Sequence, residues 1–468
     1  MASLFSAISS SLSGLQATTA QMQLISNNIS NAGQAGYTRK SAILAPVELG
    51  AAGGGTQVTG YTRAVDEALS RTLSTTLSSA GYLGTQNEYM NQVQTILGQT
   101  GNDSSNPPLV NAINQLSKAF NELAATPESN VQQQQVVQAA ADLVAQIKSA
   151  AAAVEALDRQ ITTDVGSTLS DLNSALTQIK QLNQEISKAL GAGLSAGNLQ
   201  DQRDQLVQKI SGMMSVTVME RSQGAVALYT PNGYMLMDGA QVRDFVYNGT
   251  NITDSSDPTL SLNTILTGGS LEAAAQFRAT SSPVSTTPGV SVIQKLRSQL
   301  DTLVGAFTTS TAGPPASFAY AYANATTATG EAASIFTGTD RNSIAVTPTL
   351  LDGSETIKIA CANAVVDTFN NATKSFTGDG LTLNNASYGS LVTSILANFQ
   401  QAASTIAQQS DTATAQRTYL QNKMTSATGV DINTEMVNLT TLQNAYAASA
   451  RVISIIQSLF TTLMNIAA

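Results

Sequence analysis

The two ends of the chain carry the feature that most restricts its fold, an apolar helical repeat in sequence almost without charge. Residues 1–38 contain no Asp, Glu, Lys or Arg, and from residue 436 to residue 468 the only such side chain is Arg451. Apolar residues recur at alternating steps of four and three in both segments, which predicts helices that pack lengthwise against other helices. These seam positions are Phe5, Ile8, Leu12, Leu15, Met22 and Ile29 near the N-terminus and Leu439, Leu442, Tyr446, Ile453, Ile456, Phe460 and Leu463 near the C-terminus.

The flanks of both seams are Ser, Thr, Gln and Ala, where a solvated coiled coil has Glu and Lys. Small uncharged flanks can be packed against on several sides, so we expect a coiled coil buried inside an assembly. A buried helical hairpin within one domain would also explain the repeats, but not why both uncharged segments lie at the chain ends. We further expect the ends to be mobile in the monomer and to become helical on assembly.

Between the ends, helical periodicity predominates and β structure is inserted. The longest helical pattern starts at Pro127 and continues to Leu190, while residues 38–64 are predicted to be extended, with a flexible loop at 53–55. The fold class is therefore mainly α with inserted β. We predict a terminal coiled-coil assembly domain (1–60 with 430–468), a long helical-bundle rod domain (61–212 with 283–307 and 388–429), a smaller β-rich outer domain (213–282) and an irregular β and loop region of open domain membership (308–387).

Several function classes are excluded by missing residue types. The chain has no His, which removes Ser-His-Asp and Cys-His catalysis and HExxH zinc sites, and its one cysteine, Cys361, is expected to be a small buried residue. The net charge is −9 without clustered Lys and Arg, which argues against nucleic acid. The first charged side chain is Arg39 and the C-terminal stretch contains many polar residues, so we expect neither a secretory signal peptide nor membrane insertion.

Acidic and glycine-rich segments give no catalytic or ligand site either. Asp201 and Asp204 lie three residues apart near a helix start, where the helix dipole favours them, and no His accompanies them. The glycine-rich segments 53–55 and 191–197 lack the following Lys-Ser or Lys-Thr of a phosphate loop. The sequence predicts no catalytic residue, no cofactor and no metal, although a carboxylate pair set by the fold stays open.

Two segments near the ends resemble a known family. The segment from Ser26 to Tyr37 resembles the Asn-Asn-Ile-Ala-Asn…Gly-Tyr motif of the bacterial flagellar axial family, which comprises rod, hook and hook-junction proteins. Ser30 stands where that family usually has Ala, and Ala35 where Thr is common. Residues 430–466 are similar to the C-terminal end of the same family. The motif positions matched are Asn27, Asn28, Asn31, Gly36 and Tyr37.

A third segment narrows the resemblance to one branch. Residues 198–207 resemble the Leu-x-Asp-Gln-Arg-Asp-x-Leu segment of the hook-associated protein 1 family, the hook–filament junction proteins. The matched positions are Asp201, Gln202, Arg203, Asp204 and Leu206.

The resemblance implies a secreted structural protein without enzymatic activity, located in the extracellular flagellum at the hook–filament junction. It implies export by the flagellar type III pathway and self-assembly through the terminal helices. The implied partners are copies of the chain in a ring, the hook protein on one side, the second junction protein on the other, and an export chaperone on the C-terminal helix. A hook or rod protein is the nearest alternative, opposed by the long helices predicted at 128–190 and 390–425. A type III-secreted effector or cell-wall hydrolase is the alternative of a different class.

Overall fold

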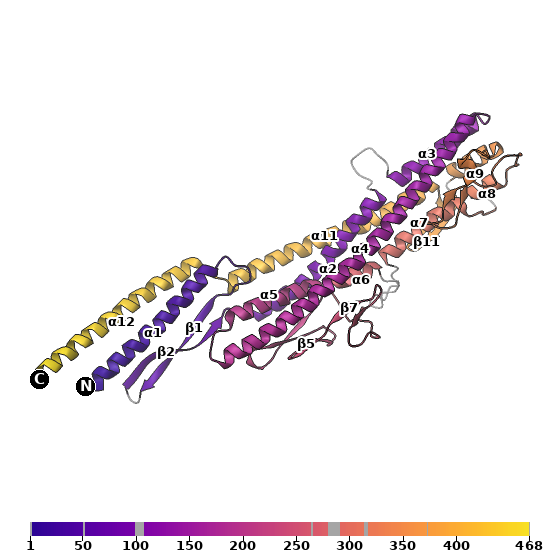
Figure 1. The fold of residues 1–468 in the computed structure, drawn as a ribbon. Coiled ribbons are helices and arrows are strands. Elements are labelled where there is room, and N and C mark those ends of the chain that lie inside the picture. Colours follow the sequence, from indigo (N-terminus) through magenta and orange to yellow (C-terminus); the bar gives the residue numbers. More distant parts are fainter. Residues whose placement is uncertain are drawn as a thin grey trace.

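A 62-residue helix, α4 (Asn130–Gly191), runs along most of the molecule and sets its length (Figure 1). Ser129 caps its start by accepting a hydrogen bond from the Gln132 amide, and apolar side chains then recur on one buried stripe without an interrupting proline. At 1.5 Å per residue the helix is about 93 Å long. This computed structural model describes residues 2–49, 52–98, 107–263, 265–278, 291–312, 317–371 and 373–467.

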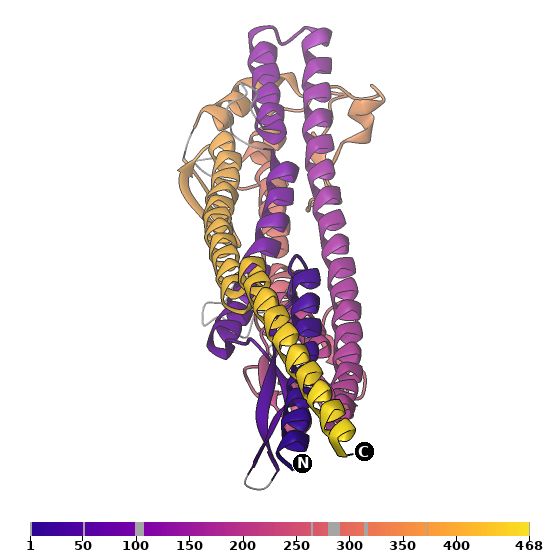
Figure 2. The ribbon, with the colours of Figure 1, turned by 90° about the vertical axis from the view of Figure 1, so that its left-hand side faces the viewer.

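Further helices pack around α4 to form the rod. Figure 2 shows α11, α2 and α4 side by side along its axis, with α11 lying on α2 and α3 on α4. One apolar cluster extends from Tyr89 to Ala403 through this bundle. The predicted class, mainly α with inserted β, is confirmed. The rod helices are α2 (Glu67–Leu97), α3 (Pro108–Ala125), α5 (Gly197–Met213), α6 (Gly269–Arg278), α7 (Val292–Thr308) and α11 (Tyr388–Thr428).

The strands predicted after residue 213 are present and lie along α4. Two asparagines of that helix hold them: Asn183 exchanges two hydrogen bonds with the backbone of Val226, and Asn173 does the same with Phe245. The helix α6 also falls within the predicted β-rich segment 213–282, but it packs on α2. The antiparallel strands are β3 (Thr217–Glu220), β4 (Val226–Tyr229), β5 (Met235–Asp238) and β6 (Gln241–Val242) in one sheet, in that order, and β7 (Phe245–Tyr247) with β8 (Ile252–Asp254) in another.

The segment 308–387 contains short helices as well as the short strands and loops that were predicted there. Phe307, Phe318, Phe369 and Tyr388 form an aromatic cluster whose rings approach to between 4.8 and 6.4 Å, and the Tyr388 hydroxyl accepts a hydrogen bond from the Phe318 amide. Cys361 is fully buried beside this cluster's helices, as expected, and burial raises the pKa of its thiol to about 12. The elements here are α8 (Phe318–Ala323), β9 (Phe336–Thr337), β10 (Ala345–Val346), α9 (Pro348–Leu351), α10 (Ala362–Asn370), β11 (Lys374–Gly378) and β12 (Leu381–Ala386).

The two chain ends form a separate body, which we call the terminal unit. It contains α1 (Ala2–Asn31), the hairpin of β1 (Lys40–Leu49) and β2 (Ala52–Arg63), and α12 (Ile432–Ala467). The helices α1 and α12 lie side by side with opposite chain directions, and the hairpin packs on α1 (Figure 1). Both ends are helical in the single chain, so the expectation that they form helices only on assembly does not hold in this structure. The hairpin supplies the reason, because it covers α1 within the same chain.

Two further expectations about the terminal unit need correction. The glycines 53–55 belong to strand β2 and are not a loop. Gly55 has φ +98°, and a Cβ there would lie 1.9 Å from the Ser13 hydroxyl oxygen, so glycine allows the strand to touch α1. Two seam positions stay exposed, Leu12 at 51% and Tyr446 at 40%. The side chains of Phe5 and Leu463, and residues 283–290 of the predicted rod segment, lie outside the described residues.

The helices α2 and α5 cross at two glycines. An added Cβ on Gly81 would lie 2.1 Å from the carbonyl oxygen of Gly212, closer than any van der Waals contact permits. We predict that Gly81→Ala lowers the free energy of unfolding by about 1–3 kcal/mol, because the helices must separate. Denaturant unfolding measures this.

The matched control is Gly84→Ala on the same helix, where a Cβ meets nothing within 4 Å. This change should stabilise the chain by about 1 kcal/mol or less through helix propensity. Equal stability changes in the two variants would contradict the tight crossing.

A half-buried ion network joins α4 to α6 and α7. Arg297 donates to Glu155 at 2.9 and 2.5 Å and to Asp158 at 3.1 Å, and Arg278 also pairs with Asp158. Hydrogen bonding by Arg297 holds the pKa of Glu155 below its ordinary value. A carboxyl group with a depressed folded-state pKa contributes stability above its unfolded pKa and loses that contribution as the pH falls through the folded value.

We predict that Arg297→Gln lowers the free energy of unfolding at neutral pH by about 1–2 kcal/mol, discounted for partial exposure. This difference in the free energy of unfolding should shrink as the pH falls below the ordinary pKa of a glutamate. Glu155 then becomes protonated in the unaltered protein as well as in the variant, and the bond to Arg297 loses its charge. Urea unfolding at a series of pH values measures it. Arg159→Gln, on the exposed face of the same helix, is the control. It should change neither the free energy of unfolding nor the dependence of that energy on pH.

Candidate functional site

Three short segments connect the terminal unit to the rod: residues 32–39, 64–66 and 429–431. They are tied to one another, because the Arg39 amide donates to the Thr428 carbonyl and the Ala64 amide donates to the Arg39 carbonyl, each at 2.8 Å. We call this region, together with the side chains that bridge it to α5, the joint. Most of the residues in the two family motifs meet here.

Asn28 is the first of the joint's two central residues, and it is fully buried. Its amide nitrogen donates to the Lys40 carbonyl at 2.9 Å and to Glu435 Oε2 at 3.2 Å. Its amide oxygen accepts from the Lys40 amide at 3.1 Å and from the Tyr37 hydroxyl at 3.0 Å. The side chain therefore uses both donors and its acceptor, and it links α1, β1 and α12.

Asp201 is the second, on the first turns of α5, with 4% of its surface exposed. It accepts hydrogen bonds from Lys40 Nζ at 2.6 Å and from the Thr38 amide and hydroxyl at 3.2 and 2.7 Å. Arg63 Nη1 lies 3.3 Å from the same carboxylate. A buried carboxylate is costly unless its charge is paired and its oxygens are hydrogen-bonded, and both conditions are met here. Burial lowers the pKa of Lys40, and the bond to Asp201 opposes that shift.

The neighbouring motif residues on α5 complete the contact. Asp204 lies 2.6 Å from Arg63, and Arg203 donates to the Gly224 carbonyl at 2.6 Å and to Asp204 at 3.3 Å. Gln205 donates to the carbonyl oxygen of Ala35 at 2.8 Å. The adjacent Gly36 has φ +76°, and a Cβ there would lie 2.5 Å from Gln205 Nε2, so this motif position requires glycine.

The structure separates the motif residues into groups. Asn28, Gly36, Tyr37, Asp201, Arg203 and Asp204 meet at the joint, with Lys40 Nζ 3.4 Å from the centre of the Tyr37 ring. Asn27 and Gln202 are exposed, Asn31 is half-buried away from the joint's bonds, and Leu206 packs on the rod core. The sequence interpretation missed Lys40, Arg63 and Glu435. A signal was available, because they are among the few charges in or beside the two nearly uncharged ends.

The joint's chemistry is structural. Its buried polar groups are engaged with one another, and no group of His, Cys, Asp and Glu suited to a metal occurs among the described residues. Clefts of about 240 and 390 Å³ flank it, with Arg63 lining both. In the described part of the chain, no helix is both long and apolar enough for a membrane span.

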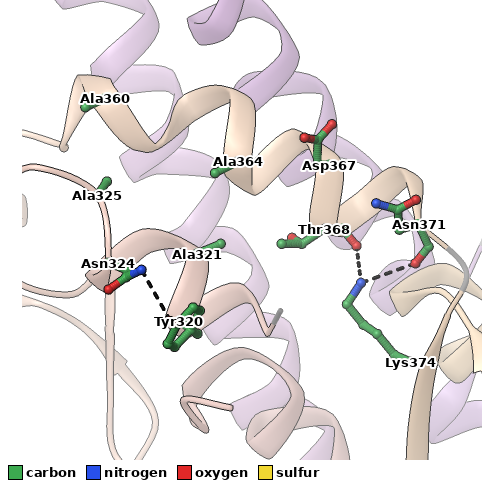
Figure 3. A pocket seen from close by; sticks show the side chains of 10 residues that line it. All are labelled: Tyr320, Ala321, Asn324, Ala325, Ala360, Ala364, Asp367, Thr368, Asn371 and Lys374. Atoms are coloured by element: carbon green, nitrogen blue, oxygen red, sulfur yellow. Dashed lines mark hydrogen bonds between the residues drawn. The ribbon is translucent and has the colours of Figure 1, made fainter. Parts of the chain in front are cut away.

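A third cleft, of about 370 Å³, lies between α8 and α10 at the far end of the rod (Figure 3). Its buried cation, Lys374, donates to the carbonyl oxygens of Thr368 and Asn371 at 2.5 and 3.2 Å. These are the last carbonyls of α10, where a cation is favoured by the helix dipole. The lysine therefore caps a helix.

We predict that Asn28→Ala speeds hydrogen exchange at the Lys40 amide by about ten- to hundred-fold, because loss of its acceptor and of the α12 contact costs about 1–3 kcal/mol. Exchange measured by NMR or mass spectrometry on the intact chain tests this. Asn27→Ala is the control, since Asn27 is exposed one residue away, and it should leave the Lys40 amide protected. Equal exchange rates at the Lys40 amide in both variants would show that the Asn28 side chain does not hold this part of the joint together.

Residues 90–312 match the family described as "Flagellar hook-associated protein FlgK helical domain", and residues 421–466 match "Flagellar basal body rod FlgEFG protein C-terminal". Flagellar hook-associated protein 1 of Salmonella typhimurium is 31% identical over 261 residues, covering 54% of this chain and 46% of that protein. Its counterparts in Escherichia coli and Bacillus subtilis are 30% and 28% identical, covering 54% and 50% of this chain and 46% and 48% of theirs. The chain thus spans about half the length of these relatives.

A solved structure, the flagellar hook junction protein FlgK from Burkholderia pseudomallei, is similar with a TM-score of 0.46 and 21% identity, covering 57% of this chain and 46% of that one. The first family match extends from the last turns of α2 to just beyond the end of α7 and includes the motif at 201–204 on α5. The second covers the end of α11 and nearly all of α12. Over about half of its length, the chain is thus similar to the FlgK helical domain and to flagellar hook-associated protein 1 of several bacteria.

Proposed function

We propose that this chain is a structural subunit of the bacterial flagellum that forms the junction between hook and filament and assembles through its terminal helices. Its similarity to hook-associated proteins supports the location, and the surface of α12 supports the mode of assembly. The proposal includes export by the flagellar type III pathway and a position in the extracellular flagellum.

The observation that carries the proposal is a second apolar row on α12, which no part of the described chain covers. The inner row, which includes Leu442, Ile453 and Ile456, is half-buried or buried where α12 lies on α1. The outer row lies on another face of the helix. It contains Val437 and, further along, Val452, Ile455 and Leu459, which follow one another at steps of three and four. The four side chains expose 66, 44, 60 and 51% of their surfaces.

An exposed apolar row of this length indicates a surface for contact with another protein, which stays uncovered in the single chain. Between residues 436 and 468 only Arg451 is charged, so no ring of Glu and Lys keeps this face solvated. Covering the row with the terminal helices of neighbouring copies removes it from water, at roughly 25 cal/mol for each Å² of apolar surface. A ring of copies is therefore the first partner proposed.

The other proposed partners follow the family. They are the hook protein on one side, the second junction protein on the other, and an export chaperone that covers α12 before assembly. The seam positions of α1 and α12 are proposed as assembly residues, and the four-part division of the chain remains part of this proposal. No enzymatic activity is proposed, since the polar groups of the joint are all engaged structurally.

We predict that Ile455→Asp leaves the melting temperature of the monomer nearly unchanged, because this side chain is already exposed. Incorporation at the hook tip should fail, since a carboxylate buried among apolar side chains of neighbouring copies costs several kcal/mol. The measurement is motility and electron microscopy in a strain of the source bacterium that lacks its own copy. Bare hooks without filaments are the expected result.

The matched control is Ser454→Asp, which places the same charge one residue away on a polar face of α12. This variant should assemble and support motility. Normal filaments with Ile455→Asp, or an equal loss with both variants, would show that the outer row is not the assembly contact.

A further inference from the structure

We propose that the joint is a hinge about which the terminal unit turns as one body relative to the rod, and that Asp201 is the residue that holds it at one angle. The inference concerns the single chain and does not depend on the proposed place in the flagellum. Asp201 is here a positioning residue, since it acts by holding Lys40 and Arg63.

The first support is that apolar packing stops on the rod side of the joint. Among the described residues, the two clusters of buried apolar side chains extend from Leu69 to Leu420 and contain no residue of α1, β1, β2 or α12. Packing between elements of the two bodies is confined to the place where β2 meets α5, apart from marginal contacts. A close-packed apolar core shared by two bodies resists their sliding past each other. Since the terminal unit and the rod share no such core, the angle between them is set by polar contacts.

The second support is the shape of the joint. The three crossing segments are short and are hydrogen-bonded to one another through Arg39. The clefts of about 240 and 390 Å³ flank these segments and leave room for a small rotation. A few residues at the ends of elements, flanked by open space, are typical of hinges between domains.

The third support is the arrangement of the bonds that cross the hinge. Asp201 belongs to α5 in the rod, while Lys40 begins β1 and Arg63 ends β2 in the terminal unit. The Asn28 bonds, by contrast, lie between elements of the terminal unit and the segment that leaves it. Removing the Asp201 carboxylate therefore takes away its bonds to Thr38, Lys40 and Arg63, so that the contact with α5 is left to the Arg63–Asp204 pair and the Gln205–Ala35 bond, while the internal bonds of the terminal unit stay in place.

The test measures distances between spin labels in the full-length chain. Cys361 is buried and stays unlabelled, so labels can be attached at Gln181→Cys on α4 and Gln443→Cys on α12, which are both exposed. This pair spans the hinge. A second pair, Gln23→Cys on α1 with Gln443→Cys, lies within the terminal unit.

With Asp201 present, the pair across the hinge should give one narrow distance distribution. Asp201→Ala should broaden it about two-fold or more, because additional angles become populated. Asp201→Asn keeps the shape and one acceptor oxygen but loses the charge that holds Lys40 and Arg63, so it should also broaden the distribution. This second variant serves if the alanine variant does not fold.

The matched control is Asp171→Ala, which removes an exposed ion pair with Lys209 within the rod and changes the net charge equally. It should leave the distribution narrow, and the pair within the terminal unit should stay narrow in every variant. Distributions across the hinge that remain as narrow as in the unaltered protein for both Asp201 variants would overturn the proposal. Equal broadening of the pair within the terminal unit would also overturn it, since that result indicates local unfolding.

Discussion

The buried carboxylate of Asp201 is bonded to three places on the other side of the joint: the crossing residue Thr38, the start of β1 and the end of β2. The relative placement of the two bodies depends on these bonds and on the neighbouring Arg63–Asp204 and Gln205–Ala35 contacts, because no apolar cluster spans the joint among the described residues. A buried ion pair contributes little net stability compared with apolar packing, but it tolerates only one geometry. The joint therefore specifies an orientation more than it strengthens the fold.

The same logic explains where this chain places its few charges. Only 11% of its residues are charged, and the buried or half-buried ion pairs include two sets, one at the joint and one between α4, α6 and α7. The helices of the chain ends present mainly Ser, Thr, Gln and Ala around their apolar residues. Such surfaces are soluble in a monomer and can be packed against without removing a charge from water. Both the outer row of α12 and the uncharged flanks of α1 follow this pattern.

Elements with local patterns could be predicted from the sequence, and elements that depend on distant contacts could not. The apolar stripe of α4 located that helix to within a few residues of each end. The short helices of segment 308–387 were not predicted, because their order comes from an aromatic cluster assembled from separate helices and loops. At the joint, the motif residues were identified but their partners were not, since Asp201 lies 161 residues from Lys40 and Asn28 lies 407 from Glu435.

The length of α4 gives the joint mechanical leverage. One end of this helix lies beside α5 at the joint, and the other reaches the opposite tip of the molecule (Figure 1). Because the helix is about 93 Å long, a tilt of about 5° at the joint displaces the far tip by about 8 Å. An adjustment of a single buried ion pair is thereby converted into a movement close to the width of a helix at the opposite end.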